Sequence, residues 1–110
     1  MEATRVTAEE IKERMARGEQ FTFVDTRNPQ AWGEADTKLP GAVRVPADAV
    51  EQHLADMPRD RMIVTYCTWP HEASSARVAQ VLREHDFKKS YALEGGFDAW
   101  LDAGGAVEPK

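Results

Sequence analysis

Hydrophobic residues along this chain follow two alternating patterns. Short apolar runs rich in β-branched and aromatic residues predict strands at residues 5–6, 21–25, 42–45, 61–66 and 90–93. Between these runs, apolar residues recur every three or four positions, which is typical of amphipathic helices. Strands and helices therefore alternate along the chain. This order predicts an α/β fold, a parallel sheet with helices on both faces joined by right-handed crossovers.

The predicted helices begin at residues that commonly cap helices. Thr7 and Glu10 form a capping box, Asn28-Pro29 marks a second helix start, and Asp48 is expected to cap a short helix that ends near Pro58. The helix after Cys67 is expected to run to about residue 86, and the last one to end at Gly104-Gly105. The apolar residues expected to face the core are Ala8, Ile11, Met15, Trp32, Val50, Leu54, Val78, Val81, Leu82, Phe97, Trp100 and Leu101.

The stretch from residue 63 to residue 77 carries the most informative chemistry. Its first residues form the longest apolar run bounded by polar turns, so we expect residues 63–66 to be the most central strand. Cys67 follows directly, before a helix, where open α/β sheets place their ligand sites. The N–H groups and partial positive charge of a helix start favour a thiolate and can hold an anion carried on the sulfur. The alternative is a small buried structural thiol.

Length and composition limit the classes of function. A chain of 110 residues forms one domain, and 42% hydrophobic with 30% charged residues is ordinary for a soluble globular protein. A net charge of −5 argues against nucleic acid and against anionic membranes as partners. No apolar run reaches the roughly 20 residues that span a bilayer, and no signal peptide is evident, so a cytoplasmic location is expected.

A single cysteine excludes an internal disulfide and a site built from several cysteines. The histidines show no metal-ligand spacing with one another, and we expect neither a metal nor a cofactor. These histidines are His53, His71 and His85.

Four short motifs occur at the ends of predicted strands or at turns, and together they extend over most of the chain. They are Phe23-Val24-Asp25-Thr26-Arg27, Leu39-Pro40-Gly41-Ala42, Val64-Thr65-Tyr66-Cys67 and Leu93-Glu94-Gly95-Gly96-Phe97-Asp98-Ala99-Trp100.

On these motifs the chain resembles the rhodanese family of sulfurtransferases. The resemblance implies a single rhodanese-like domain over residues 1–110, with a five-stranded parallel sheet. It also implies that Cys67 attacks the outer sulfur of a small anionic donor such as thiosulfate and carries that sulfur as a persulfide. The acceptor would be cyanide or a thiol, and a sulfur-relay protein is a further expected partner.

The loop after Cys67 departs from the family pattern Cys-x-x-Gly-x-Arg-Ser. Pro70 lacks an N–H group, and Glu72 stands where the family often has an arginine that grips thiosulfate. About two extra residues separate Cys67 from Ser75 when the following helices are aligned. Two geometries fit: a wider loop with the helix starting near Ser74 or Ser75, or a short loop with Pro70 as the first helical residue.

The residues around Cys67 form the candidate substrate-binding set. Arg77 is the candidate replacement for the missing arginine, or else a surface charge that pairs with Glu72. Ser74 and Ser75 cap the helix or line the loop, while Asp25 and Arg27 are expected to fix nearby loops. Trp32 and Trp100 are expected in the core. The full substrate-binding set is Thr68, Trp69, His71, Glu72, Ala73, Ser74, Ser75 and Arg77.

Two other functions remain open from sequence. A phosphatase or arsenate reductase on the same fold would use Cys67 against phosphorus or arsenic. A wider loop would suit that chemistry, but the nearest arginine, Arg77, lies ten residues after the cysteine. Alternatively, the domain is a non-catalytic interaction module in which the altered loop binds a partner.

Overall fold

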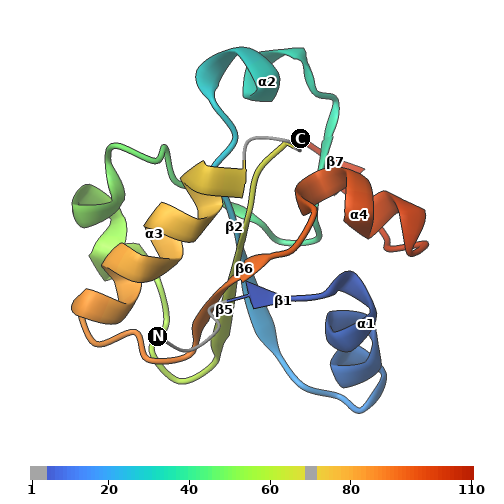
Figure 1. The fold of residues 1–110 in the computed structure, drawn as a ribbon, viewed down its shortest axis with the longest axis horizontal. Coiled ribbons are helices and arrows are strands. Elements are labelled where there is room, and N and C mark those ends of the chain that lie inside the picture. Colours follow the sequence, from blue (N-terminus) through green and yellow to red (C-terminus); the bar gives the residue numbers. More distant parts are fainter. Residues whose placement is uncertain (1–4, 69–71) are drawn as a thin grey trace.

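A five-stranded parallel sheet forms the centre of the molecule (Figure 1). The computed structural model describes residues 5–68 and 72–110; the side chains of residues 72 and 73 are outside this description. The strand order is β1-β6-β5-β2-β4, so β5 is central, as the sequence predicts. The strands are β1 (Arg5–Val6), β2 (Phe21–Asp25), β4 (Val43–Arg44), β5 (Met62–Tyr66) and β6 (Ser90–Leu93).

Helices cover both faces of this sheet, which confirms the predicted fold class (Figure 1). A short antiparallel pair, β3 with β7, ties the C-terminal residues to the segment after α2 and was not expected from sequence. No helix within residues 5–68 and 72–110 is long and apolar enough to cross a membrane. The remaining elements are α1 (Ala8–Ala16), α2 (Pro29–Glu34), β3 (Thr37–Lys38), the 3₁₀ helix η1 (Val50–Asp56), α3 (Glu72–Glu84), α4 (Gly96–Asp102) and β7 (Glu108–Pro109).

The side chains of β5 alternate between two separate hydrophobic cores. Met62, Val64 and Tyr66 join the core beneath α1 and α4, together with the buried Trp100. Ile63 points the other way, into the core formed with η1 and α3. Because successive side chains of a strand face opposite sides, Cys67 continues this alternation on the α3 side of the sheet.

The capping residues of the first two helices are confirmed. Thr7 and Glu10 form both halves of a capping box, and the Asn28 side chain accepts from the Ala31 N–H at 2.8 Å. The prediction for Asp48 is wrong, because η1 begins after Ala49 and has no side-chain cap. Asp48 is instead an exposed residue in the turn before η1.

Three of the expected core residues lie outside the core. Met15 and Leu101 are 40% and 45% exposed and lie next to the last residues of α1 and α4. Trp32 is half-buried, and its ring lies against cationic groups instead of apolar ones: Arg27, Arg44 and Lys110 are 5.4, 5.1 and 4.6 Å from the ring centroid. Ring and cation attract each other through the ring quadrupole, so the surface provides a stable place for this tryptophan.

Gly95→Ala is expected to destabilise the fold more than Gly18→Ala. Both glycines have positive φ angles, +77° and +88°, so alanine at either costs about 1 kcal/mol of backbone strain. Only at Gly95 would the new Cβ lie 2.6 Å from the Ala99 Cβ, and this overpacking adds about 1–3 kcal/mol. Urea unfolding of the two variants measures the difference. Equal losses would show that the start of α4 can shift to make room.

Candidate active site around Cys67

Cys67 lies directly after β5, at the carboxyl edge of the sheet. Its side chain is 1% exposed, and its Sγ atom lies 3.6 Å from the Oγ atom of Ser75 on α3. The alternation along β5 explains this contact, because it turns Cys67 toward α3 and away from α4. The sulfur therefore sits between the end of the central strand and the first turns of α3.

The start of α3 lies next to the sulfur, which contacts the Ser75 hydroxyl. The helix begins at Glu72, between the two starting points that the sequence allows. Ser74 and Ser75 are therefore its third and fourth residues, close to the end where a helix carries partial positive charge. The Thr65 hydroxyl donates to the Ser75 carbonyl at 2.8 Å and fixes this turn against β5. A negative charge on the sulfur would face the positive end of a 13-residue helix.

Two further contacts hold the end of β5. The Phe97 N–H, from α4, donates to the Cys67 carbonyl at 2.9 Å. On the other side, the N–H and hydroxyl of Thr26 both donate to the Tyr66 carbonyl, at 2.9 and 3.0 Å. The backbone on which the cysteine stands is thus fixed from both neighbouring segments.

A buried ion pair lies beside this strand end. Asp25 and Arg27 are 0% and 3% exposed, and the Arg27 Nη2 atom lies 2.6 Å from the Asp25 Oδ2 atom. The Asp25 carboxylate also accepts from the Tyr66 hydroxyl at 2.8 Å and from the Arg27 backbone N–H at 2.9 Å. The Tyr66 hydroxyl accepts in turn from the Leu39 N–H at 3.2 Å. This places Asp25 and Arg27 where they fix loops around the cysteine.

The environment shifts the pKa values of two groups in this network. Burial, with a further contribution from the Asp25 carboxylate, raises the pKa of Tyr66 well above its usual range. Tyr66 thus stays protonated and keeps donating to Asp25. Partial burial lowers the pKa of the Arg44 guanidinium, while the attraction of Asp25 opposes this shift. Neutral pH lies far below the range in which an arginine loses its proton, so Arg44 remains a cation there.

A small cavity of about 180 Å³ lies at the same edge of the sheet, between the ends of β2 and β4 and the start of α3. Its lining includes Ser74, the neighbour of Ser75, and Thr26, whose hydroxyl donates to the Tyr66 carbonyl; Cys67 itself does not line it. Three arginines reach its wall. The lining residues are Thr26, Arg27, Asn28, Pro29, Arg44, Pro46, Ala47, Asp48, Ser74 and Arg77.

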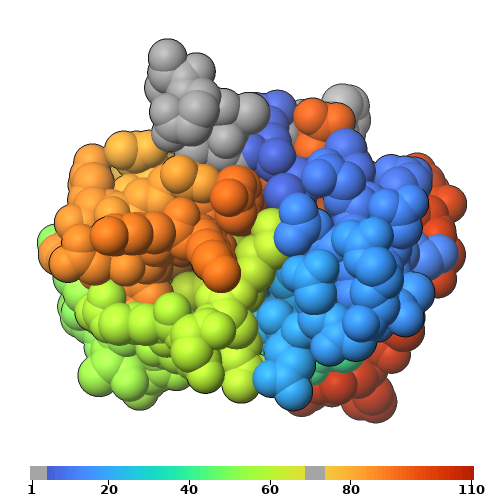
Figure 2. Space-filling view, turned by 90° about the horizontal axis from the view of Figure 1, so that it is seen from below, coloured from blue at the N-terminus to red at the C-terminus, as the bar shows by residue number. Residues whose placement is uncertain are grey.

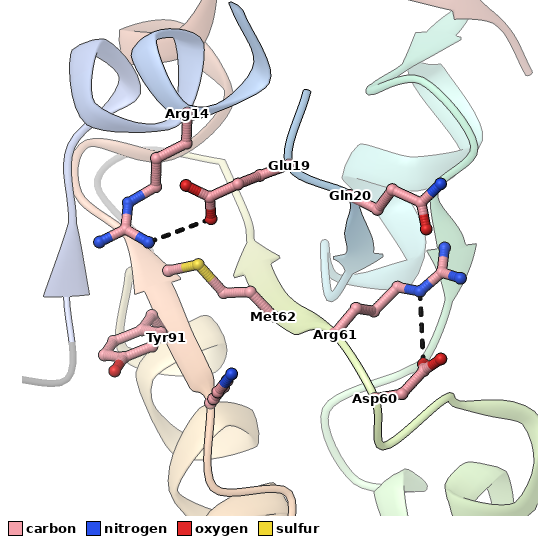
Figure 3. Close-up of a pocket in the computed structure, with 8 residues that line it drawn as sticks. Arg14, Glu19, Gln20, Asp60, Arg61, Met62 and Tyr91 are labelled. Atoms are coloured by element: carbon pink, nitrogen blue, oxygen red, sulfur yellow. Dashed lines mark hydrogen bonds and ion pairs between the residues drawn. The ribbon is translucent and has the colours of Figure 1, made fainter. Parts of the chain in front are cut away.

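Another cavity, of about 440 Å³, lies at the opposite edge of the sheet (Figure 2). There the segment before β5 meets the α1–β2 connection at the amino ends of the strands, around Met62 (Figure 3). Arg14 pairs with Glu19 at 3.3 Å, and Arg61 with Asp60 at 3.6 Å, so its charges are largely balanced. With Cys67 at the other end of β5, this cavity is not part of the cysteine site.

The structure brings together some of the residues that the sequence singles out. Ser75 contacts the sulfur of Cys67, and Thr68 is half-buried and follows the cysteine. Ser74 and Arg77 line the small cavity at the same edge of the sheet. Two of the predicted residues, Trp69 and His71, lie outside the described residues. Glu72 and Ala73 belong to the first turn of α3, but their side chains are outside the description.

Sequence reasoning missed Arg44 and Thr26. Both follow from a rule that was available: the carboxyl ends of parallel strands meet at one edge of a sheet. Arg44 ends β4 and Thr26 follows β2, so both belong to the edge that carries Cys67. Arg44 stands between Val43 and Val45, so the sequence indicated only an ordinary polar position within a strand.

A buried cysteine at the carboxyl edge of a parallel sheet, facing the start of a helix, defines an α/β domain with a candidate nucleophilic thiol. Residues 7–103 match the rhodanese-like domain family, and the chain belongs to that family.

Two curated relatives show how far the similarity extends. The chain is 30% identical over 94 residues to the thiosulfate sulfurtransferase GlpE of Vibrio cholerae, covering 86% of this chain and 85% of that protein. It is 27% identical over 97 residues to the probable adenylyltransferase/sulfurtransferase MoeZ of Mycobacterium tuberculosis, covering 86% of this chain but only 24% of MoeZ.

Among solved structures, the rhodanese-like domain of the Alr3790 protein from Anabaena sp. is similar throughout. The TM-score is 0.78 at 28% identity, and the match covers 100% of this chain and 81% of that one. The predicted family resemblance is therefore confirmed.

Asp25→Asn is expected to lower the free energy of unfolding by about 3–5 kcal/mol, because it leaves the Arg27 cation buried without its partner. Tyr66→Phe should cost less, about 1–3 kcal/mol, since it removes one hydroxyl and leaves the Leu39 N–H unpaired. Urea unfolding followed by tryptophan fluorescence measures both. A loss below about 1 kcal/mol for Asp25→Asn would show that water or another group replaces the carboxylate.

Proposed function

We propose that this protein is a rhodanese-type sulfurtransferase that carries sulfane sulfur on Cys67. Membership of the rhodanese-like family and the similarity to sulfurtransferases at 26–30% identity support this class of activity. One observation supports Cys67 as the residue that carries the sulfur. The only cysteine of the chain faces the start of α3, with its Sγ atom 3.6 Å from the Ser75 Oγ atom.

The proposed reaction has two steps. The thiolate of Cys67, its proton having passed to solvent, attacks the outer sulfur of thiosulfate. The bond between the two sulfurs of the donor breaks, and sulfite leaves with the electron pair. The persulfide formed on Cys67 is itself an anion. Cyanide or a thiolate then attacks its outer sulfur, and Cys67 leaves as a thiolate, ready for another donor.

The surroundings of the sulfur suit both anions in this cycle. Ser75 can donate its hydroxyl proton to a thiolate or a persulfide, and the positive end of the α3 dipole favours an anion near this residue. In this proposal the substrate-binding residues are those expected from sequence, Thr68, Trp69, His71, Glu72, Ala73, Ser74, Ser75 and Arg77. No metal or cofactor takes part in either step.

The acceptor in the cell is proposed to be a thiol, either of a small molecule or of a sulfur-relay protein. The similarity to MoeZ, in which the matching region is a quarter of the chain, supports the relay alternative. A reducing compartment such as the cytoplasm would keep the single cysteine as a thiol between turnovers.

Intact mass after incubation with thiosulfate tests the proposal directly. The expected result is a gain of one sulfur atom that cyanide removes with release of thiocyanate. Cys67→Ala is the control and is expected to show no gain. No gain in the folded wild-type protein would contradict thiosulfate as donor. Hydrolysis of a phosphate ester that depends on Cys67 would then favour the phosphatase alternative.

Ser75→Ala is expected to slow alkylation of Cys67 at neutral pH by about tenfold, because the thiolate loses a hydrogen bond worth about 1.4 kcal/mol. Mass spectrometry with iodoacetamide measures the rate. The matched control is Ser74→Ala, one residue away on α3, which should react like the wild type. Equal rates for all three proteins would show that Ser75 does not stabilise the thiolate.

A further inference from the structure

Thr65 is a polar residue in a fully buried part of the sheet. It lies near the end of the central strand β5, at 0% exposure, between Val24 of β2 and Ala92 of β6. Because side chains alternate along a strand, Ile63, Thr65 and Cys67 share the face that α3 covers. A valine would fill the position of Thr65 with the same shape, so the hydroxyl is the feature that requires an explanation.

The hydroxyl of Thr65 reaches two carbonyl groups. It donates to the Ser75 carbonyl of α3 at 2.8 Å, and it lies 3.4 Å from the Tyr91 carbonyl of β6. A buried hydroxyl without a hydrogen bond destabilises a fold, so the bond to Ser75 makes a threonine acceptable at this position. A carbonyl within a helix accepts from the N–H group four residues later, so the strand gives the Ser75 carbonyl a second donor.

Ser75 is therefore in contact with two residues on one face of the same strand. Its carbonyl accepts from Thr65, and its Oγ atom lies 3.6 Å from the Sγ atom of Cys67, two residues farther along the chain. Ser75 is itself 0% exposed. A helix turn that is fixed to the strand at the Ser75 carbonyl keeps the Ser75 hydroxyl next to the sulfur. The Thr65 bond thus controls a distance between two other residues.

The distance between the Ser75 hydroxyl and the sulfur decides how strongly this hydroxyl stabilises a negative sulfur. A hydrogen bond to a charged group is strong, and it weakens steeply as its geometry departs from the ideal. A small displacement of the first turn of α3 therefore weakens the bond. The thiolate and the persulfide are both anions, so both steps of the proposed reaction depend on this geometry.

We propose that Thr65 is a positioning residue for Cys67: its hydroxyl fixes the first turn of α3 so that Ser75 stabilises the anionic sulfur. This inference rests on the proposed function, which it deepens by assigning control of the thiol's reactivity to a residue of the central strand. Thr65 is fully buried, so it acts through Ser75 and not by contact with a substrate.

The rate of Cys67 alkylation by iodoacetamide, measured as a function of pH, tests the proposal. Thr65→Val removes the hydroxyl and keeps the shape of the side chain, while the Ser75 carbonyl keeps its bond within the helix, so the variant is expected to fold. We expect it to react about threefold more slowly at neutral pH, through an upward shift of the midpoint of the pH profile by about half a pH unit. The rate at high pH, where every thiol is ionised, should not change.

Thr22→Val is the matched control, because it makes the same change at another buried threonine. Thr22 lies on the same face of the sheet, in the neighbouring strand β2, and pairs with Ile63 at the other end of β5 from Cys67. This variant should keep the wild-type pH profile. Thr65→Ser retains the hydroxyl and is expected to react at close to the wild-type rate. If Thr65→Val does not fold, Thr65→Ala provides the same comparison.

A double-mutant cycle separates positioning from a general loss of stability. Because Thr65 is proposed to act through Ser75, Thr65→Val should have no further effect on alkylation once Ser75→Ala has removed the serine hydroxyl. Thermal unfolding of the four proteins of the cycle gives the comparison of their stabilities. Independent effects of the two substitutions would overturn the proposal, as would a Thr65→Val profile equal to that of the wild type or an equal shift in Thr22→Val.

The positioning role and the sulfurtransferase function can fail separately, because alkylation requires no sulfur donor. A coupled effect of Thr65 and Ser75 on alkylation, with no sulfur transferred from thiosulfate, would keep Thr65 as a positioning residue and contradict the sulfur-transfer function. Persulfide formation on Cys67, with an alkylation profile that Thr65→Val leaves unchanged, would keep that function and overturn the positioning role.

Discussion

The buried carboxylate of Asp25 is the group on which the geometry of this edge of the sheet depends. It lies at 0% exposure, where an unpaired charge would be very costly, so its neighbours must supply donors. They come from the following loop through Arg27 and from the central strand through Tyr66. Through the Tyr66 hydroxyl the network reaches Leu39, and through Arg27 it reaches Thr37. One charge therefore fixes the positions of β2, β5 and the segment around β3.

The orientation of the cysteine follows from that arrangement and from strand geometry. Tyr66 must face the α4 side of the sheet to reach Asp25 and to pack in the core there. The next residue along an extended chain must then face the opposite side, which is the side of α3. The same constraint that satisfies the buried carboxylate thus turns Cys67 toward the start of the helix. Phe97 and Thr26 hold the backbone on which this alternation depends.

Much of this fold could be predicted from sequence because its signals are local. The apolar runs and the capping residues identify each strand of the main sheet and the start of α1 and α2, and a chain of alternating elements leaves few topologies. The pair of β3 with β7 could not be found in this way, since two-residue strands have no periodicity and their pairing joins residues 37–38 to 108–109. Trp32 was misplaced because its stabilising partners are cations that lie far away in sequence, such as Lys110.

At this edge of the sheet too, contacts between residues close in sequence could be predicted, and contacts between distant residues could not. Cys67 and the serines of α3 lie within nine residues of one another, so their proximity could be inferred from the strand-to-helix pattern. Arg44 lies 23 residues before the cysteine and reaches Asp25 only because β4 pairs with β2 in parallel register.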